Sequence, residues 1–411
     1  MTQRTRNKPG RKAKKPLQAH EVQGGKYVEQ IIDLLRPLRG HCEDPKRRLH
    51  YDEFCAWLLL YFFTPVLDSM RGLQQASDIA TIKRKLKLPR FSLGSFSEAA
   101  QVFDPELLLP IIEEISGSLG DIESEKFPPS LSHRPVAVDG TLLEALPSMV
   151  WALWRDDEHR AAKLHLQFDL RKGTPEKPVL SHGQSSETQA LRQNLQAGRL
   201  YIADRGYFDF DLLSSILAAD SSFVTRVRNN IVYETIEEKP LSESDKQQGI
   251  EADLIVRAGC HSKSNIIDQP LRLVRIQVAD GPTAHGAGRV DSKSKLYRKA
   301  SSDHTLMLLS DQLDLDVSHI ALLYRNRWQI ELFFRWFKKV LQADRLLSVS
   351  ENGLTLVVYC ALIASLLVSL WTGRKPTKRT FEMLCFYFSG MADEQDVLTH
   401  IERLQVAEKN K

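Results

Sequence analysis

Apolar positions recur at helical spacing through the first part of the chain. Residues 51–66 form a strongly apolar stretch, and residues 73–87 place apolar side chains on one side and basic side chains on the other. Residues 91–115 continue the pattern with one or two more helical segments. The sequence therefore predicts a mostly helical region over residues 26–118.

The pattern changes after a proline-containing linker at residues 119–135. Short apolar or alternating runs now predict five strands, with helices after the third and the fourth. Three strands in a row, followed by alternation of strand and helix, imply a mixed α/β sheet. The predicted strands are 135–143, 162–170, 177–182, 199–204 and 222–228, and the helices are 187–197 and 209–219.

Residues 229–303 interrupt this alternation. They contain two strand-like runs, 252–258 and 271–278, and a stretch rich in Gly, Ser, Lys and Arg, so we predict a β-rich insertion. A strand at residues 305–310 returns to the core, and one long helix is expected over residues 316–341.

The apolar segment Leu354–Trp371 has 18 residues and no charge, which reaches the lower end of membrane-spanning length. It also contains Thr355, Ser365 and Ser369, and basic residues follow it at 374–379. We expect a helix buried against the sheet and no membrane contact. A membrane anchor is the alternative, and fractionation would decide between them.

Charge and cysteine content say little about the binding partners and the cellular location of the chain. The 411 residues carry a net charge of +4, but seven basic residues and no acid lie within residues 1–20, which predicts a disordered basic arm. That arm could contact phosphate or only aid solubility. The five cysteines form no C-x-x-C pair, so neither a zinc site nor a disulfide framework is expected, and a reducing cytoplasm is the simplest setting.

Three acidic residues hold positions suited to metal chemistry. Asp139 closes the first predicted strand, Asp204 closes the fourth, and Glu331 lies in the middle of the long helix. Ligands of α/β sheets gather at the carboxyl ends of strands, and carboxylate oxygens suit Mg²⁺ or Mn²⁺. Three such carboxylates could hold two ions beside one phosphate. Taken singly, each acid could equally be a turn or capping residue.

The helix around Glu331 adds a second pattern. Tyr324, Arg327, Glu331 and Lys338 share one helix face at about 100° per residue, beside an apolar face that would pack on the core. An acid for metal, two bases for phosphate oxygens and a phenol together suit a phosphodiester. An ordinary amphipathic helix with an Arg327–Glu331 ion pair is an equal alternative on geometry alone.

The spacing Tyr-x2-Arg-x3-Glu-x6-Lys resembles the YREK signature of bacterial insertion-sequence transposases of the insertion-sequence-4 type. Residues 136–143 (VAVDGTLL) and 201–213 (YIADRGYFDFDLL) are similar to the first two acidic regions of that family. The resemblance covers about residues 70–372.

This resemblance implies a ribonuclease-H-like core with flanking helices and a β-strand insertion before the catalytic glutamate. It implies a DDE triad of Asp139, Asp204 and Glu331 that binds two Mg²⁺ (or Mn²⁺) ions. Enzymes of this kind cut both ends of their element, and the freed 3′-hydroxyl then attacks target DNA.

The resemblance also implies DNA contacts and partners. Tyr324, Arg327 and Lys338 would contact the backbone of the terminal DNA, and Trp328 would either stabilise a displaced base or pack in the core. The partners would be terminal inverted repeats, target DNA and further copies of the chain in a dimer or larger synaptic complex. The bacterial cytoplasm, near the nucleoid, is the expected location. The helical region would read the DNA ends, with a basic cluster of Lys83, Arg84, Lys85 and Lys87 that could instead be a solvated face.

These expectations divide the chain into seven regions. They are a basic arm (1–25), a helical DNA-end-binding region (26–118), a linker (119–135), the first part of the core (136–228), the insertion (229–303), the second part of the core (304–372) and a helical tail (373–411). Two other functions stay open: a nuclease or resolvase on the same core that cuts without joining, and a catalytically silent DNA-binding protein.

Overall fold

The computed structural model of the chain contains two compact units. One combines Met1–Phe96 with Glu382–Lys411, and the other is Ser97–Phe381. The predicted basic arm at 1–25 lies almost entirely outside the described residues. The structure describes residues 25–41, 47–80, 83, 87–156, 158–259, 267–277, 305–345 and 347–409.

The first unit is helical, as the sequence predicts. Helix α2 is buried on nearly all sides, which explains its unbroken apolar sequence. Phe63 of α2 stacks on Phe388, with ring centroids 4.8 Å apart, so the two ends of the chain pack together within this unit. The helices are α1 (Gly25–Leu35), η2 (Arg36–His41), α2 (Tyr51–Phe63), α3 (Met70–Asp78), α5 (Leu93–Val102), α13 (Lys378–Ser389) and α14 (Glu394–Lys409), and α5 and α13 cross the boundary between the units.

The helix predicted over residues 73–87 is interrupted at Ile79. Helix α3 ends at Asp78, and Ile79 after it is extended and 49% exposed. Ala80 and Lys83 are helical again, and Lys83 N–H donates to the Ile79 carbonyl, so the chain bends at Ile79 between two helical stretches. The buried hydroxyl of Ser77 accepts a hydrogen bond from the backbone N–H of Phe91, which holds the later part of the chain against α3. Local periodicity contains no sign of this long-range contact.

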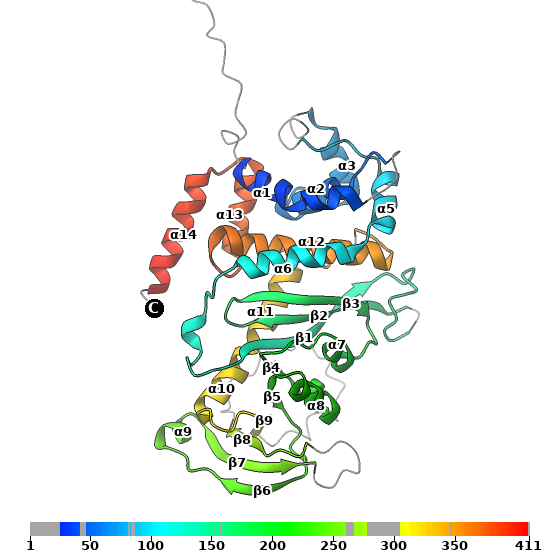
Figure 1. Ribbon diagram of the computed structural model, residues 1–411. Coiled ribbons are helices and arrows are strands. Elements are labelled where there is room, and N and C mark those ends of the chain that lie inside the picture. Colours follow the sequence, from blue (N-terminus) through cyan, green and yellow to red (C-terminus); the bar gives the residue numbers. More distant parts are fainter. Residues whose placement is uncertain are drawn as a thin grey trace, which may run out of the picture. The chain divides into compact units, whose positions relative to one another are not determined.

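The second unit is built on one nine-stranded sheet, in the order β3-β2-β1-β4-β5-β9-β8-β7-β6 (Figure 1). Strands β1, β2 and β3 are antiparallel neighbours, whereas β1, β4 and β5 run parallel, with helices α7 and α8 in the crossovers. This confirms the mixed, ribonuclease-H-like arrangement. The elements are β1 (Arg134–Ala145), β2 (Arg160–Asp169), β3 (Thr174–His182), α7 (Glu187–Gln193), β4 (Arg199–Ala203), η5 (Arg205–Tyr207), α8 (Phe210–Ala218) and β5 (Ser222–Arg226).

The insertion extends this sheet instead of forming a separate layer. Strand β9 pairs with β5 on one side and β8 on the other, both antiparallel. Strand β6 was not predicted, because at the sheet edge its residues are almost all exposed and it lacks an alternating buried face. The Gly- and Ser-rich part of the predicted insertion lies outside the described residues. The elements are β6 (Tyr233–Glu238), α9 (Glu243–Gln247), β7 (Ile250–Ala258), β8 (Leu271–Gln277) and β9 (Thr305–Ser310).

The predicted long helix is two helices that meet at Arg327. Arg327 keeps helical backbone angles, but the bonds from Arg327 N–H to Tyr324 O and from Ile330 N–H to Arg327 O span only three residues. The single-helix prediction is therefore wrong at the arginine of the signature, where the turn tightens. The two helices are α10 (Val317–Asn326) and α11 (Trp328–Lys339).

Helix α12 (Glu351–Thr372) is the one helix of the described residues that is long and apolar enough to cross a membrane, and 94% of its apolar window is buried inside the protein. It lies beside α6 (Leu109–Ser118) against β3 (Figure 1). The hydroxyl of Tyr359 donates to the Pro178 carbonyl at 3.1 Å. The prediction of a helix buried against the sheet is confirmed. Short 3-10 helices η3 (Pro105–Leu108) and η4 (Ser124–Lys126) complete this unit.

Candidate active site

Asp139 and Asp204 lie on neighbouring parallel strands. Asp139 is in the middle of β1, which corrects the prediction that it closes a strand: β1 continues to Ala145 because β2 pairs with it along its whole length. The pairing of β1 with β4 ends at Ala137 and Ile202, so Asp139 lies just beyond it. Asp204 directly follows β4 and accepts from the Gly206 N–H at 2.8 Å. Both acids therefore lie where β1 and β4 separate.

Arg327 connects the strand acid to the helix acid. Its Nη1 lies 3.8 Å from Oδ2 of Asp139, and its Nη2 forms an ion pair with Oε1 of Glu331. The three side chains keep exposed fractions of 21%, 15% and 29% for Asp139, Arg327 and Glu331. The ion pair of an ordinary amphipathic helix is thus present, but the same guanidinium also reaches β1, which an ordinary helix does not require.

The charges at this site are not balanced. Burial raises the pKa of Asp139 to about 7, although Arg327 and the Gly140 N–H favour the charged form, and the charges of Asp204 and Glu187 raise this pKa further. The carboxylates of Asp204 and Glu187 are therefore close enough to Asp139 to repel its charged form. A bound cation would relieve this repulsion.

Tyr324 and Lys338 complete the group on the same side of the sheet. The guanidinium carbon of Arg327 lies 5.8 Å from the centroid of the Tyr324 ring, and Lys338 Nζ donates to Thr141 Oγ1 of β1 at 2.9 Å. Burial is the main cause that raises the pKa of Tyr324, and the Asp204 charge adds to it. Arg327 and Lys338 therefore contact β1 directly, while Tyr324 and Glu331 lie beside Arg327. Their apolar neighbours Ile330, Phe333, Phe334, Phe337 and Leu341 are buried.

Trp328 does not pack in the core. It is 40% exposed, and the guanidinium carbon of Arg335 lies 5.9 Å from its ring centroid. Of its two predicted roles, core packing is therefore wrong, and stabilisation of a displaced base stays a prediction.

The basic cluster of the helical region belongs to the other unit. Lys83 and Lys87 are described, and Lys87 has a left-handed backbone with φ of 53°. Arg84 and Lys85 lie outside the described residues. DNA contact by this cluster stays a prediction.

Three residues near the triad were not predicted from the sequence. Tyr207 is buried, and burial together with the charges of Glu187, Asp139 and Asp204 raises its pKa. Arg226 ends β5, and its charge acts on Tyr324. The rule that strand ends carry functional side chains could have found Arg226, whereas Glu187 gives no local signal.

The donor set fits a hard divalent cation. Asp139, Asp204 and Glu331 offer only carboxylate oxygens, and the repulsion between the partly buried Asp139 and Asp204 favours a cation beside them. Within the described part of the chain, no group of three or more His, Cys, Asp or Glu side chains is gathered closely enough to hold an ion as it stands. Arg327 engages Oε1 of Glu331 in an ion pair.

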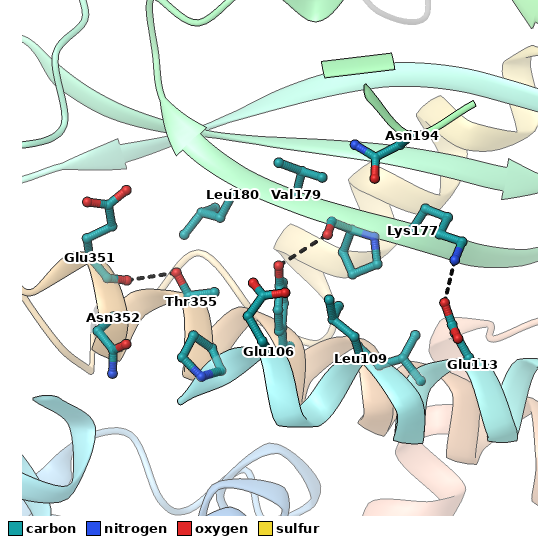
Figure 2. Close-up of a pocket in the computed structure, with 14 residues that line it drawn as sticks. Glu106, Leu109, Glu113, Lys177, Val179, Leu180, Asn194, Glu351, Asn352 and Thr355 are labelled. Carbon is teal, nitrogen blue, oxygen red and sulfur yellow. Dashed lines mark hydrogen bonds and ion pairs between the residues drawn. The ribbon is translucent and has the colours of Figure 1, made fainter. Parts of the chain in front are cut away.

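A separate hollow of about 580 Å³ lies between β3, η3, α6 and α12, on side chains such as Glu106, Lys177, Leu180 and Thr355 (Figure 2). None of the triad lines it. Lys177 and Glu113 form an ion pair at its rim (Figure 2).

A ribonuclease-H-like sheet that gathers two strand aspartates, a helix glutamate and an arginine defines the class of DDE nucleotidyl-transfer proteins. The family model described as "Transposase DDE domain" matches residues 130–367, more than half of the chain, and the chain belongs to this family.

Three relatives carry transposase names. A protein named transposase y4zB of Sinorhizobium fredii is 27% identical over 51% of this chain and 53% of its own length. A protein named as a transposase for insertion sequence element IS5377, from Geobacillus stearothermophilus, is 22% identical over 81% and 82%. A third, named for element IS4SA of Synechocystis, is 21% identical over 74% and 82%. The chain thus spans about half of the first relative and about four fifths of the other two.

Among solved structures, the chain is similar to a piggyBac transposase in a synaptic complex with hairpin DNA. The TM-score is 0.37 and the identity 12%, over 92% of this chain and 78% of that chain. A similarity this low adds nothing to the argument from the site.

Proposed function

We propose that this chain is a transposase that cuts DNA at the ends of its own element and joins those ends to target DNA. Asp139, Asp204 and Glu331 are the catalytic acids. The observation that carries the proposal is the convergence of separate elements: Arg327 contacts both Asp139 and Glu331, and the Asp204 charge acts on Asp139. Membership of the DDE transposase family supports it.

The three acids would hold two Mg²⁺ or Mn²⁺ ions. Such ions supply Lewis-acid chemistry: they make a water or a 3′-hydroxyl more nucleophilic and stabilise the leaving oxygen. The acids contribute the negative charge that binds and spaces the cations, and the buried position of Asp139 strengthens its electrostatic interactions.

The basic residues and the aromatic residues of helices α10 and α11 would position the DNA. Arg327 can move from Glu331 to a phosphate, where its planar fork binds two oxygens at once. Lys338, held by Thr141, offers a second phosphate contact beside β1. Tyr324 lies next to Arg327, and the exposed ring of Trp328 can stack on a displaced base.

The partners that fit this activity are the terminal inverted repeats, target DNA and at least one further copy of the chain. Synapsis of two ends requires a dimer or a larger complex on DNA, in the bacterial cytoplasm near the nucleoid. The helical region and its basic cluster, including Lys83, Arg84, Lys85 and Lys87, would contribute to binding of the ends through phosphate contacts.

The test uses the purified full chain, DNA with the ends of its element, and Mg²⁺. Glu331→Gln keeps the shape of the side chain and removes its charge, so we expect binding of the ends to persist while nicks and joined products disappear. Normal cleavage by Glu331→Gln would show that the site is assigned wrongly. Cleavage by the wild type without any joined product would favour the nuclease alternative.

A further inference from the structure

Glu187 lies directly against the strand that carries Asp139. It is the first residue of α7, whose cap Ser186 accepts from the Gln189 N–H at 3.3 Å. Gly140, next to Asp139 in β1, leaves room for it: a Cβ atom on Gly140 would lie only 3.0 Å from Glu187 Oε1. A side chain at position 140 would therefore push the Glu187 carboxylate away from the site.

The charge of Glu187 acts on the active site and is only partly neutralised. Its charge contributes to raising the pKa of both Asp139 and Tyr207, after the larger effect of burial. Its cation is Lys163 of β2, with Nζ 3.4 Å from Oε1 and exposed fractions of 15% for Lys163 and 29% for Glu187. Lys163 Nζ also donates to the Ser185 carbonyl at 3.1 Å, which fixes it beside α7.

A small cavity with both apolar and polar lining adjoins Glu187. It has a volume of about 20 Å³, and His165, Gln167 and Tyr207 also line it. His165 Nδ1 and Gln167 Oε1 are buried without a hydrogen-bond partner among the described residues. A space of this size holds about one water molecule. Because a buried polar atom is costly unless it is hydrogen-bonded, the cavity suits a water that connects these side chains to the carboxylate.

We propose that Glu187 is a positioning residue of the active site: a fourth carboxylate whose charge, balanced by Lys163, sets how tightly the Asp139 side of the site holds a divalent cation. The proposal rests on the proposed function, in which the triad binds such a cation. Glu187 acts through Asp139 and does not itself coordinate the cation.

The first test measures Mn²⁺ binding to the full chain without DNA, by electron paramagnetic resonance or calorimetry. Glu187→Gln should weaken Mn²⁺ binding on the order of tenfold, as is typical for residues behind metal ligands. Glu251→Gln is the matched control, because Glu251 of β7 pairs with Arg275 of β8 across neighbouring strands, as Glu187 pairs with Lys163 of β2, and neither Glu251 nor Arg275 lines the small cavity. Its Mn²⁺ affinity should equal that of the wild type.

The second test separates charge from structure. Lys163→Gln removes the balancing cation and keeps a donor for the Ser185 carbonyl, so it should tighten Mn²⁺ binding severalfold. The variant that carries both Glu187→Gln and Lys163→Gln should bind Mn²⁺ with an affinity close to that of the wild type. A purely structural role predicts the opposite for Lys163→Gln, namely weaker binding. If Glu187→Gln fails to fold in a thermal unfolding control, the direction of the Lys163→Gln change still decides the matter.

Asp139→Asn distinguishes failure of this inference from failure of the proposed function. Loss of Mn²⁺ binding in Asp139→Asn, together with no change in Glu187→Gln, would overturn only the role of Glu187. Unchanged Mn²⁺ binding in Asp139→Asn would overturn the metal site itself, and with it the proposed function.

Discussion

Each half of the nine-stranded sheet has an aspartate that pairs with an arginine, and the two pairs are built differently. In the insertion, Arg272 of β8 and Asp253 of β7 are both 3% exposed and joined by two hydrogen bonds of 2.7 and 2.6 Å. In the core, Arg327 and Asp139 are 3.8 Å apart and stay partly exposed.

The remaining contacts of each arginine explain the difference. Arg272 Nη1 donates to the carbonyls of Gln312, Leu313 and Leu315, so its donors are used within the protein. Arg327 divides its guanidinium between two carboxylates that also carry unbalanced charge. A saturated buried pair stabilises the fold, whereas a shared, partly open pair leaves charge available to a ligand.

The largest expected effect on folding comes from the insertion. Arg272→Ala leaves the Asp253 charge buried without its partner, so the free energy of unfolding should fall by about 3–5 kcal/mol. Urea unfolding followed by circular dichroism measures this change. A loss below about 1 kcal/mol would show that this pair is as replaceable as an exposed one, and the contrast between the halves would disappear.

The matched change in the core should affect chemistry more than folding. Arg327→Lys keeps the charge but loses the planar fork that reaches Asp139 and Glu331 together. We expect DNA cleavage at the element ends to fall about a hundredfold, comparable to the loss of one transition-state donor. The free energy of unfolding should change by less than about 1 kcal/mol, because the pair is partly exposed. A stability loss as large as that of Arg272→Ala would make Arg327 a structural residue.

The smallest effect on stability is expected at Trp328. Because its ring is 40% exposed, Trp328→Ala should lower the free energy of unfolding by less than about 1 kcal/mol. The control is Phe337→Ala on the buried face of the same helix, which should cost about 3–5 kcal/mol. If the two variants are equally destabilised in thermal melts, Trp328 packs like a core residue and its proposed role at a displaced base loses its basis.

The sequence predicted the first half of the sheet better than the second. Strands β1 to β5 alternate or are fully apolar because helices or neighbouring strands bury them, and this leaves a readable pattern. Strand β6 pairs only with β7 and stays exposed. It is defined by its hydrogen bonds to β7, and these leave no pattern of apolar residues in the sequence. The break at Arg327 is hidden for a related reason: its backbone stays helical while its hydrogen bonds shorten.

The sequence predicted those residues of the candidate site that lie on one helix face or at a strand end. Asp204 and the four signature residues followed from spacing and resemblance, but Asp139 lies within its strand, at a point set by where β4 stops pairing. Glu187 was not predictable, because its approach to Asp139 depends on Gly140 and on how α7 packs over β1. Such proximity arises only in three dimensions.

The position of β9 limits how far this chain could be shortened. Since β9 is hydrogen-bonded on both sides, excising β6 to β8 would leave one of its flanks bare, with open backbone donors and acceptors along a row of apolar residues. Bare flanks of this kind recruit strands from other molecules and lead to aggregation. A shortened version of the chain would therefore have to keep β8, or pair β9 with another designed strand.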